Sequence, residues 1–244
     1  MRILIVNDDG IDSAGLKHLA LWARTKGEVT VAAPKYEQSG KSHAINFITP
    51  FEVKAVELGE GIKAYSVDST PADCTRFGII GLGVQYDLVL SGINKGINMS
   101  GDIVYSGTVG AIFEAEHSNH RAVALSIAKE DALPDFSVLD EIFDFLFKND
   151  LFADSALYNV NIPSSPKGIL ITRQGDAYFS DEFFHLEGDM YIQRGHSVPE
   201  TTPNDLSLDT VAFREGYISV TPMTLSRTSA EAYARLTERI QKEI

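Results

Sequence analysis

The first half of the chain alternates between short, largely apolar runs and segments whose apolar residues have helical spacing. Four runs are typical of strands buried on both faces: residues 3–6, 29–33, 87–90 and 122–127. Four segments between or after them predict helices: residues 13–26, 70–82, 107–118 and 135–148. Strands that alternate with helices pair in parallel through right-handed crossovers. The pattern therefore predicts a three-layer α/β sandwich with a mostly parallel sheet.

The second half has a different pattern. Residues 156–222 carry short alternating stretches and turn residues, without a clear helix, and predict three strands: 158–162, 168–172 and 216–221. Residues 176–195 are rich in Tyr, Phe, Asp and Glu and indicate an extended hairpin or arm. A last helix is expected over 229–242. We therefore expect a catalytic core over 1–150 and a β-rich extension over 151–244 that is not an independent domain.

Charge and composition exclude several classes of protein. The 244 residues include 34 acidic and 21 basic side chains, a net charge of −13, which disfavours a role in coating nucleic-acid polymers. No apolar run approaches the ~18 residues of a membrane span. The apolar stretch between Arg2 and Asp8 is too short for a signal peptide. The single Cys74 fits a reducing compartment, so we expect a cytoplasmic protein.

Polar loops follow three of the predicted strands. Asn7-Asp8-Asp9-Gly10 follows the first strand, residues 33–42 follow the second, and residues 91–108 follow the third. Ligands of open α/β sheets bind beyond the carboxyl ends of the strands. If these strands are parallel neighbours, the three loops meet at one edge of the sheet.

The loop residues include a pair of adjacent acids. Asp8 and Asp9 repel each other unless a positive charge lies between them, and a hard divalent cation such as Mg²⁺ or Mn²⁺ supplies it. Ser39 and Asn94 offer neutral oxygen ligands from the other two loops. The alternative is an ordinary turn, because Asp and Gly are common turn residues. The convergence of three polar loops favours the metal site.

Residues 105–108, with the sequence Tyr-Ser-Gly-Thr, precede a predicted helix. A helix N-terminus with small and hydroxyl residues is a natural anion site, although Ser106 or Thr108 can also be a simple N-cap. No Gly-x-Gly-x-x-Gly follows the first strand, and no P-loop motif occurs. These absences disfavour dinucleotide and P-loop chemistry.

Other residues are weaker candidates. His117 and His120 have a spacing that suits a soft metal, but no third ligand stands at zinc-site spacing. Cys74 is expected in the core. Lys41 and Lys95 either add positive charge to the predicted site or are solvated loop residues.

In several motifs the chain resembles the SurE (survival protein E) nucleotidases. The resemblance lies in Asn7-Asp8-Asp9-Gly10, Gln38-Ser39-Gly40, Thr70-Pro71-Ala72-Asp73-Cys74, Ser91-Gly92-Ile93-Asn94-x-Gly96-x-Asn98, Tyr105-Ser106-Gly107-Thr108, Asn159-Val160-Asn161-Ile162-Pro163 and Gly216-Tyr217-Ile218-Ser219-Val220-Thr221-Pro222. The motifs stand in the family's order and cover most of residues 1–127 and parts of 156–228. Together they are highly specific.

The resemblance implies a divalent-metal-dependent phosphatase that acts on nucleoside 5′- and 3′-monophosphates, and in some members on short polyphosphate. It implies one Mg²⁺ or Mn²⁺ per subunit, with two of its ligands, Asp8 and Asp9, also catalytic. The implied metal ligands are Asp8, Asp9, Ser39 and Asn94, and the residues near the phosphate are Asn98, Ser106, Gly107 and Thr108. It further implies a Rossmann-like core, an extended dimerisation arm and an exchanged C-terminal segment, in a homodimer or homotetramer.

Two positions depart from the family pattern. Residues 191–195 stand where the family often has an aromatic-rich stretch, and Ser226 stands where it often has Asp. Both lie outside the metal loops, so they bear on base preference and arm geometry. Two other functions use the same kind of site: a non-enzymatic nucleotide sensor, and a metal-dependent glycosyl transferase, which usually needs a larger acceptor domain.

Overall fold

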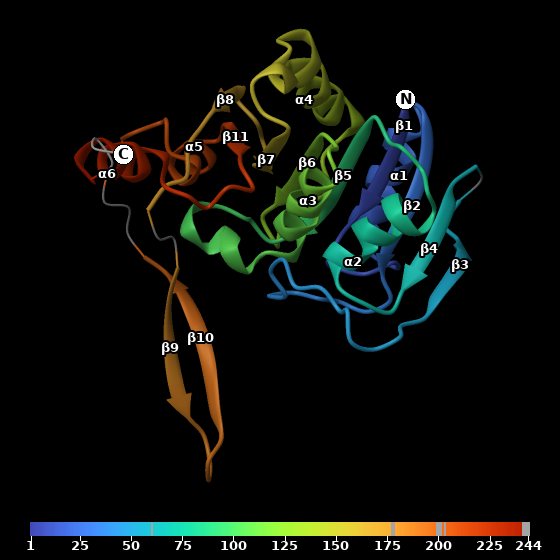
Figure 1. Ribbon diagram of the computed structural model, residues 1–244, viewed down its shortest axis with the longest axis horizontal. Coiled ribbons are helices and arrows are strands. Elements are labelled where there is room, and N and C mark those ends of the chain that lie inside the picture. Colours follow the sequence, from blue (N-terminus) through green and yellow to red (C-terminus); the bar gives the residue numbers. More distant parts are fainter. Residues whose placement is uncertain (60, 177–178, 199–201, 203, 241–244) are drawn as a thin grey trace.

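The computed structural model describes residues 1–59, 61–176, 179–198, 202 and 204–240. Within these residues nine strands form one sheet: β1 (Arg2–Val6), β2 (Glu28–Pro34), β3 (Val53–Glu57), β4 (Lys63–Val67), β5 (Leu88–Lys95), β6 (Ala122–Ile127), β7 (Leu157–Ile162), β8 (Ile169–Ile171) and β11 (Ile218–Met223). Their order across the sheet is β3-β4-β2-β1-β5-β6-β7-β11-β8 (Figure 1). The sheet thus includes strands from both halves of the chain.

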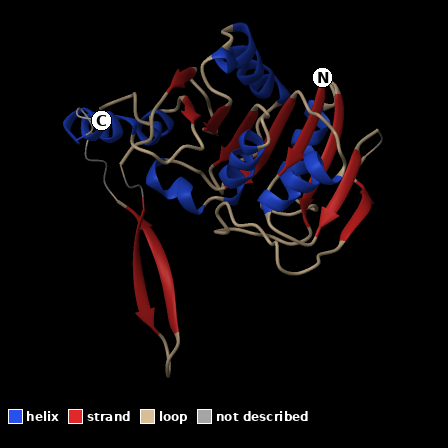
Figure 2. Cartoon of the chain, viewed as in Figure 1, coloured by secondary structure: helices blue, strands red, loops and turns tan. Residues whose placement is uncertain are grey.

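Helices cover both faces of the sheet (Figure 2). The helices of the described residues are α1 (Ala14–Ala23), α2 (Pro71–Arg76), the π-helical η1 (Phe77–Gly81), the 3-10 helix η2 (Ser100–Tyr105), α3 (Gly107–His117), α4 (Phe136–Lys148), the 3-10 helix η3 (Leu151–Ala153), α5 (Asp209–Arg214) and α6 (Ala230–Ile240), the last of which has no buried residue. Helices α1 and α4 pack on one face, and α2 and α3 pack on the other. The predicted three-layer α/β sandwich is confirmed.

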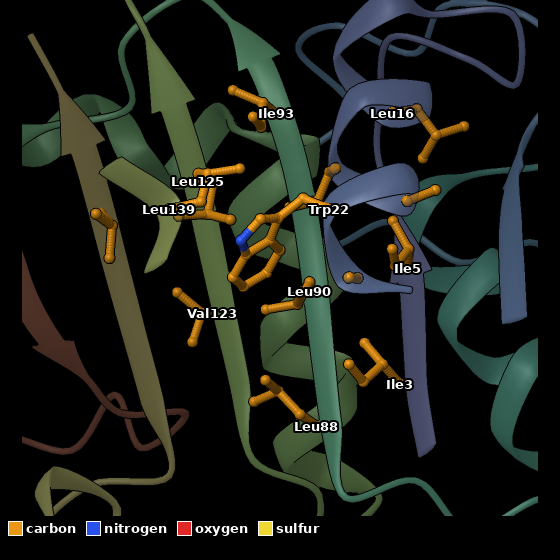
Figure 3. Packing of buried hydrophobic residues seen from close by; sticks show 14 of the residues in the cluster. Ile3, Ile5, Leu16, Trp22, Leu88, Leu90, Ile93, Val123, Leu125 and Leu139 are labelled. Carbon is orange, nitrogen blue, oxygen red and sulfur yellow. The ribbon is translucent and has the colours of Figure 1, made fainter. Parts of the chain in front are cut away.

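The core on the α1 and α4 side is built around Trp22. Its ring packs among aliphatic side chains of β5 and β6 and Leu139 of α4 (Figure 3). Its indole Nε1 donates to Asp140 Oδ1 over 2.9 Å, so its polar atom is satisfied. Leu88 and Leu139 are at most 2% exposed, and burial of each such side chain stabilises the fold by ~1.5–3 kcal/mol. This core fixes α1 and α4 on the sheet.

The strand order brings the polar loops together. β1 pairs in parallel with β2 on one side and with β5 on the other. The chain winds outward through β2 and β4, then returns to β5 and winds the other way. The crevice at such a reversal is where open α/β sheets bind ligands.

The structure corrects the prediction in three places. Residues 156–222 do contain a helix, α5, whose six residues are too few to show a helical period. The antiparallel pair β3 and β4 was not predicted, because its outer strand is mostly exposed on both faces. Strand β5 runs on to Lys95, so Asn94 lies at the end of a strand and not in the following loop.

A two-stranded hairpin projects from the sandwich (Figure 1). Strands β9 (Phe179–His185) and β10 (Tyr191–Ser197) pair antiparallel, and each of their residues is exposed. The hairpin lies where an arm was predicted, although residues 177 and 178 of that prediction lie outside the described residues. Residues 241 and 242 of the predicted last helix do so too. Among the described residues, no helix has the length and apolar character needed to span a bilayer.

Candidate active site

Backbone hydrogen bonds join the loops that follow β1 and β2. Gln38 N donates to Asp8 O over 2.7 Å, and Ile11 N donates to Pro34 O over 2.8 Å. Gly10 has φ +99°, a conformation that favours glycine, and a Cβ added to it would lie 3.4 Å from backbone atoms of Pro34 and Tyr36. The predicted Asp pair and the Ser39 loop are therefore held side by side.

The β5 end approaches the same acids. Lys95 N donates to Asp9 Oδ2 over 3.3 Å, which ties the second Asp to the strand that carries Asn94. The Asn94 amide nitrogen donates to Gly96 O over 2.6 Å. No hydrogen bond in the described part of the chain uses its Oδ1, so this oxygen is available as a ligand.

The start of α3 lies directly against Asp8. Thr108 Oγ1 donates to Asp8 Oδ1 in a buried hydrogen bond. A Cβ added at Gly107 would come within 2.9 Å of the Asp8 Cβ and 3.1 Å of its Oδ2. Only glycine allows this close approach. The carboxylate pair and the predicted anion site are thus one site and not two.

Burial perturbs both carboxyl groups. Loss of solvation raises the pKa of Asp8 to about 6; the hydrogen bond from Thr108 opposes this rise, and the neighbouring Asp9 adds to it. Loss of solvation also raises the pKa of Asp9, against the hydrogen bond from the Lys95 amide, and the charge of Glu37 raises it further. Asp8 is buried and Asp9 is half-buried, and a bound cation would stabilise the ionised forms of both carboxyl groups.

The donor atoms fit a hard divalent cation. Asp8, Asp9, Ser39 and Asn94 offer oxygen only, the ligand type that Mg²⁺ and Mn²⁺ prefer. The Ser39 hydroxyl donates to Glu37 Oε1 over 2.7 Å, which leaves its lone pairs for a ligand role. No cluster of three or more His, Cys, Asp or Glu side chains suited to a metal occurs within the described ranges. Neutral oxygens would therefore have to complete the coordination.

The alternative metal pair gains no support from the structure. His117 is exposed at the last turn of α3, whereas His120 is only 4% exposed at the start of β6. Neither ring nitrogen of His120 has a hydrogen-bond partner in the part of the chain that the structure describes. Lys41 is exposed, and the Lys95 ammonium donates to Asp131 O over 3.3 Å on the surface. The charge of Lys95 nevertheless acts on the site, because it opposes the rise of the Asp9 pKa.

The start of α3 is a capped helix N-terminus and also the predicted anion site. Ser106 Oγ accepts from Val109 N over 3.1 Å, so the N-cap alternative is realised. The first N–H groups of a helix have no partner within the helix and favour anions. The cap satisfies the Val109 N–H, and the backbone of Thr108 hydrogen-bonds Asp8, so this end of the helix faces the Asp pair.

Asn98 is held by the sheet. Its Nδ2 donates to Ser126 Oγ over 2.9 Å, and its own backbone N donates to Asn161 Oδ1 over 2.9 Å. Its carbonyl accepts from Asn159 Nδ2 and Asn161 Nδ2, at 2.7 and 2.8 Å. The side chain thus makes contacts within the protein. Two polar residues in a buried strand, Asn159 and Asn161, are the only sign of these contacts in the sequence, and they do not identify Asn98 as the partner.

The next turn of this loop is held by the C-terminal half. Asp209, which is fully buried at the start of α5, accepts from Ser100 N over 3.0 Å and from Gly175 N over 2.8 Å. Gln174 Nε2 donates to Ser100 O over 2.8 Å. Segments far apart in sequence therefore set the path between Asn94 and Ser106.

The family model described as Survival protein SurE matches residues 3–181. The chain belongs to the SurE family. A 5′-nucleotidase SurE from Thermosipho africanus is 36% identical and covers 99% of this chain and 98% of its own. One from Thermoanaerobacter sp. strain X514 is 35% identical and covers 93% of this chain and 94% of its own.

The SurE fold is also found in a solved structure. The crystal structure of a SurE protein from Aquifex aeolicus matches with a TM-score of 0.79 and 29% identity, covering 98% of this chain and 99% of that one. The resemblance seen in the sequence is thereby confirmed, and it extends over almost the whole chain.

Proposed function

We propose that this SurE chain is a divalent-metal-dependent phosphomonoesterase that hydrolyses nucleoside 5′- and 3′-monophosphates. The observation that carries the proposal is the contact of Asp8 with Thr108 and Gly107, which unites an acid pair with a helix N-terminus. Such a site offers both cation ligands and donors for a phosphate. The relatives named 5′-nucleotidase support the 5′ activity.

One Mg²⁺ or Mn²⁺ per subunit would be held by Asp8, Asp9, Ser39 and Asn94. When bound, it supplies Lewis-acid polarisation of a phosphate oxygen. The chain's own residues then have distinct tasks. Asp8 is fixed by Thr108 and has the structural role of a ligand. Asp9, the more accessible acid, orients and deprotonates the attacking water.

The start of α3 holds the phosphate. Gly107 lets the start of α3 approach the Asp pair closely, and the Ser106 cap fixes the first turn of the helix. The N–H groups of this turn stabilise the charge that spreads over the equatorial oxygens. Asn98 contributes by fixing the loop before this helix, because its amide is engaged with Ser126.

A second route gives one Asp the nucleophile role and forms an aspartyl phosphate. Hydrolysis of a nucleotide with a chiral, isotopically labelled phosphoryl group separates the routes. Direct attack by water inverts the configuration at phosphorus, whereas two successive displacements through an aspartyl phosphate retain it. An aspartyl phosphate trapped by rapid quench would assign the second route.

The proposal is tested by phosphate release from 5′-AMP, 3′-AMP, short polyphosphate and p-nitrophenyl phosphate with Mn²⁺, Mg²⁺ or EDTA. We expect release that requires metal and favours the nucleotides. Release from the aryl phosphate alone would keep the phosphatase and reject the substrate class. Nucleotide binding without release under any metal would indicate a sensor.

We also propose that the chain self-associates as a homodimer or homotetramer through the β9–β10 arm and the last helix. The exposed Phe183 and Tyr191 of the arm, 69% and 62% accessible, support this. On α6, Tyr233 and Ile240 are similarly exposed. The buried, unpaired Cys74 supports a reducing compartment such as the cytoplasm.

A further inference from the structure

A cavity of about 250 Å³ lies between α3 and the segment that follows β11. Ser106, Gly110 and Phe113 line it from one side of α3, at intervals of four and three residues. The cavity therefore begins at the proposed phosphate position and runs along the helix. Its opposite wall includes Ser226 and Arg227. A group attached to the phosphate would extend into this space.

His43 forms part of the wall, and a buried carboxylate fixes its ring. His43 Nε2 lies 2.9 Å from Glu114 Oε2, and the other carboxylate oxygen accepts from Arg76 Nη1 over 2.8 Å. The Glu114 side chain is only 4% exposed. The ring of His43 also lies 6.1 Å from that of Phe113, centroid to centroid. One edge of the imidazole is thus anchored behind the cavity.

The other nitrogen of this ring is available to a ligand. No hydrogen bond among the described residues uses His43 Nδ1. A neutral ring that donates from Nε2 to a carboxylate accepts at Nδ1. The cavity therefore combines an oriented acceptor with the apolar surfaces of Phe113, Val104 and Met223. Apolar walls with a few placed polar groups are typical of sites for small organic ligands.

We propose that this cavity binds the nucleoside of the substrate, with His43 as its hydrogen-bonding residue and Glu114 as the residue that positions His43. The inference rests on the proposed phosphatase function. A sugar hydroxyl or an exocyclic amino group is the donor that Nδ1 accepts, and the apolar wall contacts the base. The volume lies below the ~300–1,000 Å³ of drug-sized sites, so it suits one nucleoside and not a dinucleotide.

The first test compares 5′-AMP with p-nitrophenyl phosphate, which has no nucleoside. For His43→Ala we expect KM for AMP to rise about three- to tenfold, the effect of one lost hydrogen bond, with kcat/KM for the aryl phosphate within about twofold. Glu114→Gln weakens the hydrogen bond that orients the His43 ring. We therefore expect it to raise KM for AMP as well, with kcat/KM for the aryl phosphate again within about twofold. His117→Ala, on the exposed last turn of α3, is the matched control and should change neither substrate.

A second variant fills the cavity without touching the core. Ser226 is exposed at the rim, so Ser226→Phe should fold and place a ring in the nucleoside space. We expect KM for AMP to rise at least about tenfold, and KM for the aryl phosphate, whose single ring is smaller than a nucleoside, to rise less. Equal losses on both substrates, or an unchanged KM for AMP in both variants, would overturn the proposal.

Adenosine binding to the metal-free protein separates this proposal from the one it rests on. We expect calorimetry to show adenosine binding that weakens in His43→Ala and Ser226→Phe. If adenosine binds in this way but AMP is not hydrolysed, the phosphatase is wrong and the nucleoside site stands. If AMP is hydrolysed but neither variant alters adenosine binding or KM, the nucleoside site is wrong.

Discussion

The strand-end site and the β9–β10 arm differ in whether their unusual side chains are buried against partners in the same chain. At the site, Asp8 is 4% exposed and its carboxylate has a partner from α3 in the same chain. On the arm, Phe183 is 69% exposed and every residue of both strands faces solvent. The first region places its polar groups within one chain. The second leaves apolar area for which the described part of the chain provides no cover, so we assign chemistry to the first and association to the second.

The largest expected effect is on the chemistry. Asp9→Asn keeps the size of the side chain and its acceptor for Lys95 N, but it removes the base. We expect turnover of 5′-AMP to fall at least about a hundredfold, the scale of lost acid–base help, with the thermal midpoint unchanged or raised. A steady-state assay with Mn²⁺ and a melting curve measure both. Near-normal turnover would remove Asp9 from the mechanism.

The arm should respond in association and not in chemistry. Burial of one Phe side chain contributes ~1.5–3 kcal/mol, so Phe183→Asp should weaken self-association at least about tenfold. Ser180→Asp adds the same charge to the same strand without loss of apolar area, and we expect a change below about threefold. Analytical ultracentrifugation over a range of concentrations measures this. Unaltered association in Phe183→Asp would contradict the assignment of the arm.

Asp209 links the two halves of the chain to the site. Its two oxygens accept from Ser100 N and Gly175 N. In Asp209→Asn an amide NH₂ group would replace one of these oxygens and would face a buried N–H donor that no longer has an acceptor. We expect a loss of ~1–3 kcal/mol in stability and faster hydrogen exchange over residues 99–106. KM for both AMP and the aryl phosphate should rise.

The matched control for Asp209 is Tyr158→Phe. Tyr158 OH donates to Leu151 O on the other face of β7, away from the loop. Its loss should cost ~1 kcal/mol without any change in exchange over residues 99–106. Equal exchange in the two variants would show that Asp209 acts only through global stability.

The smallest expected effect is on the dependence of stability on pH. Burial of Glu114 would raise its pKa, but the hydrogen bonds from His43 and Arg76 outweigh burial and lower it below the ordinary 4.5. A lowered pKa contributes stability above pH 4.5 that is lost as pH falls through the folded value. Glu114→Gln should therefore flatten the fall of unfolding free energy below about pH 4.5. An unchanged slope in urea titrations would contradict this ion pair.

The central strands and most helices could be predicted because they are buried on both faces or amphipathic. The strand pair β3 and β4 could not, since Lys54 and Glu57 of its edge strand interrupt any apolar pattern. The six residues of α5 are too few to show a period. Short segments of this kind are defined by their tertiary partners.

The candidate site likewise has one part that could be predicted from the sequence and one part that could not. Three polar loops at strand ends predicted a meeting of Asp8 with residues of the later loops, and β1 does pair with both β2 and β5. The role of Asn98 could not be predicted in the same way. Its partners Asn159 and Asn161 are 61 and 63 residues away, and only the register of β7 beside β6 brings them to the loop.

The central claim is that one edge of the sheet in a single chain holds a divalent cation between two acids. Calorimetric titration of the metal-free protein with Mn²⁺ tests it most directly, with wild type, Asp8→Asn and Phe183→Asp compared side by side. We expect one ion per chain in wild type and in the arm variant, and binding at least about a hundredfold weaker in Asp8→Asn, because a ligating charge is lost. Equal Mn²⁺ binding by wild type and Asp8→Asn would contradict the claim.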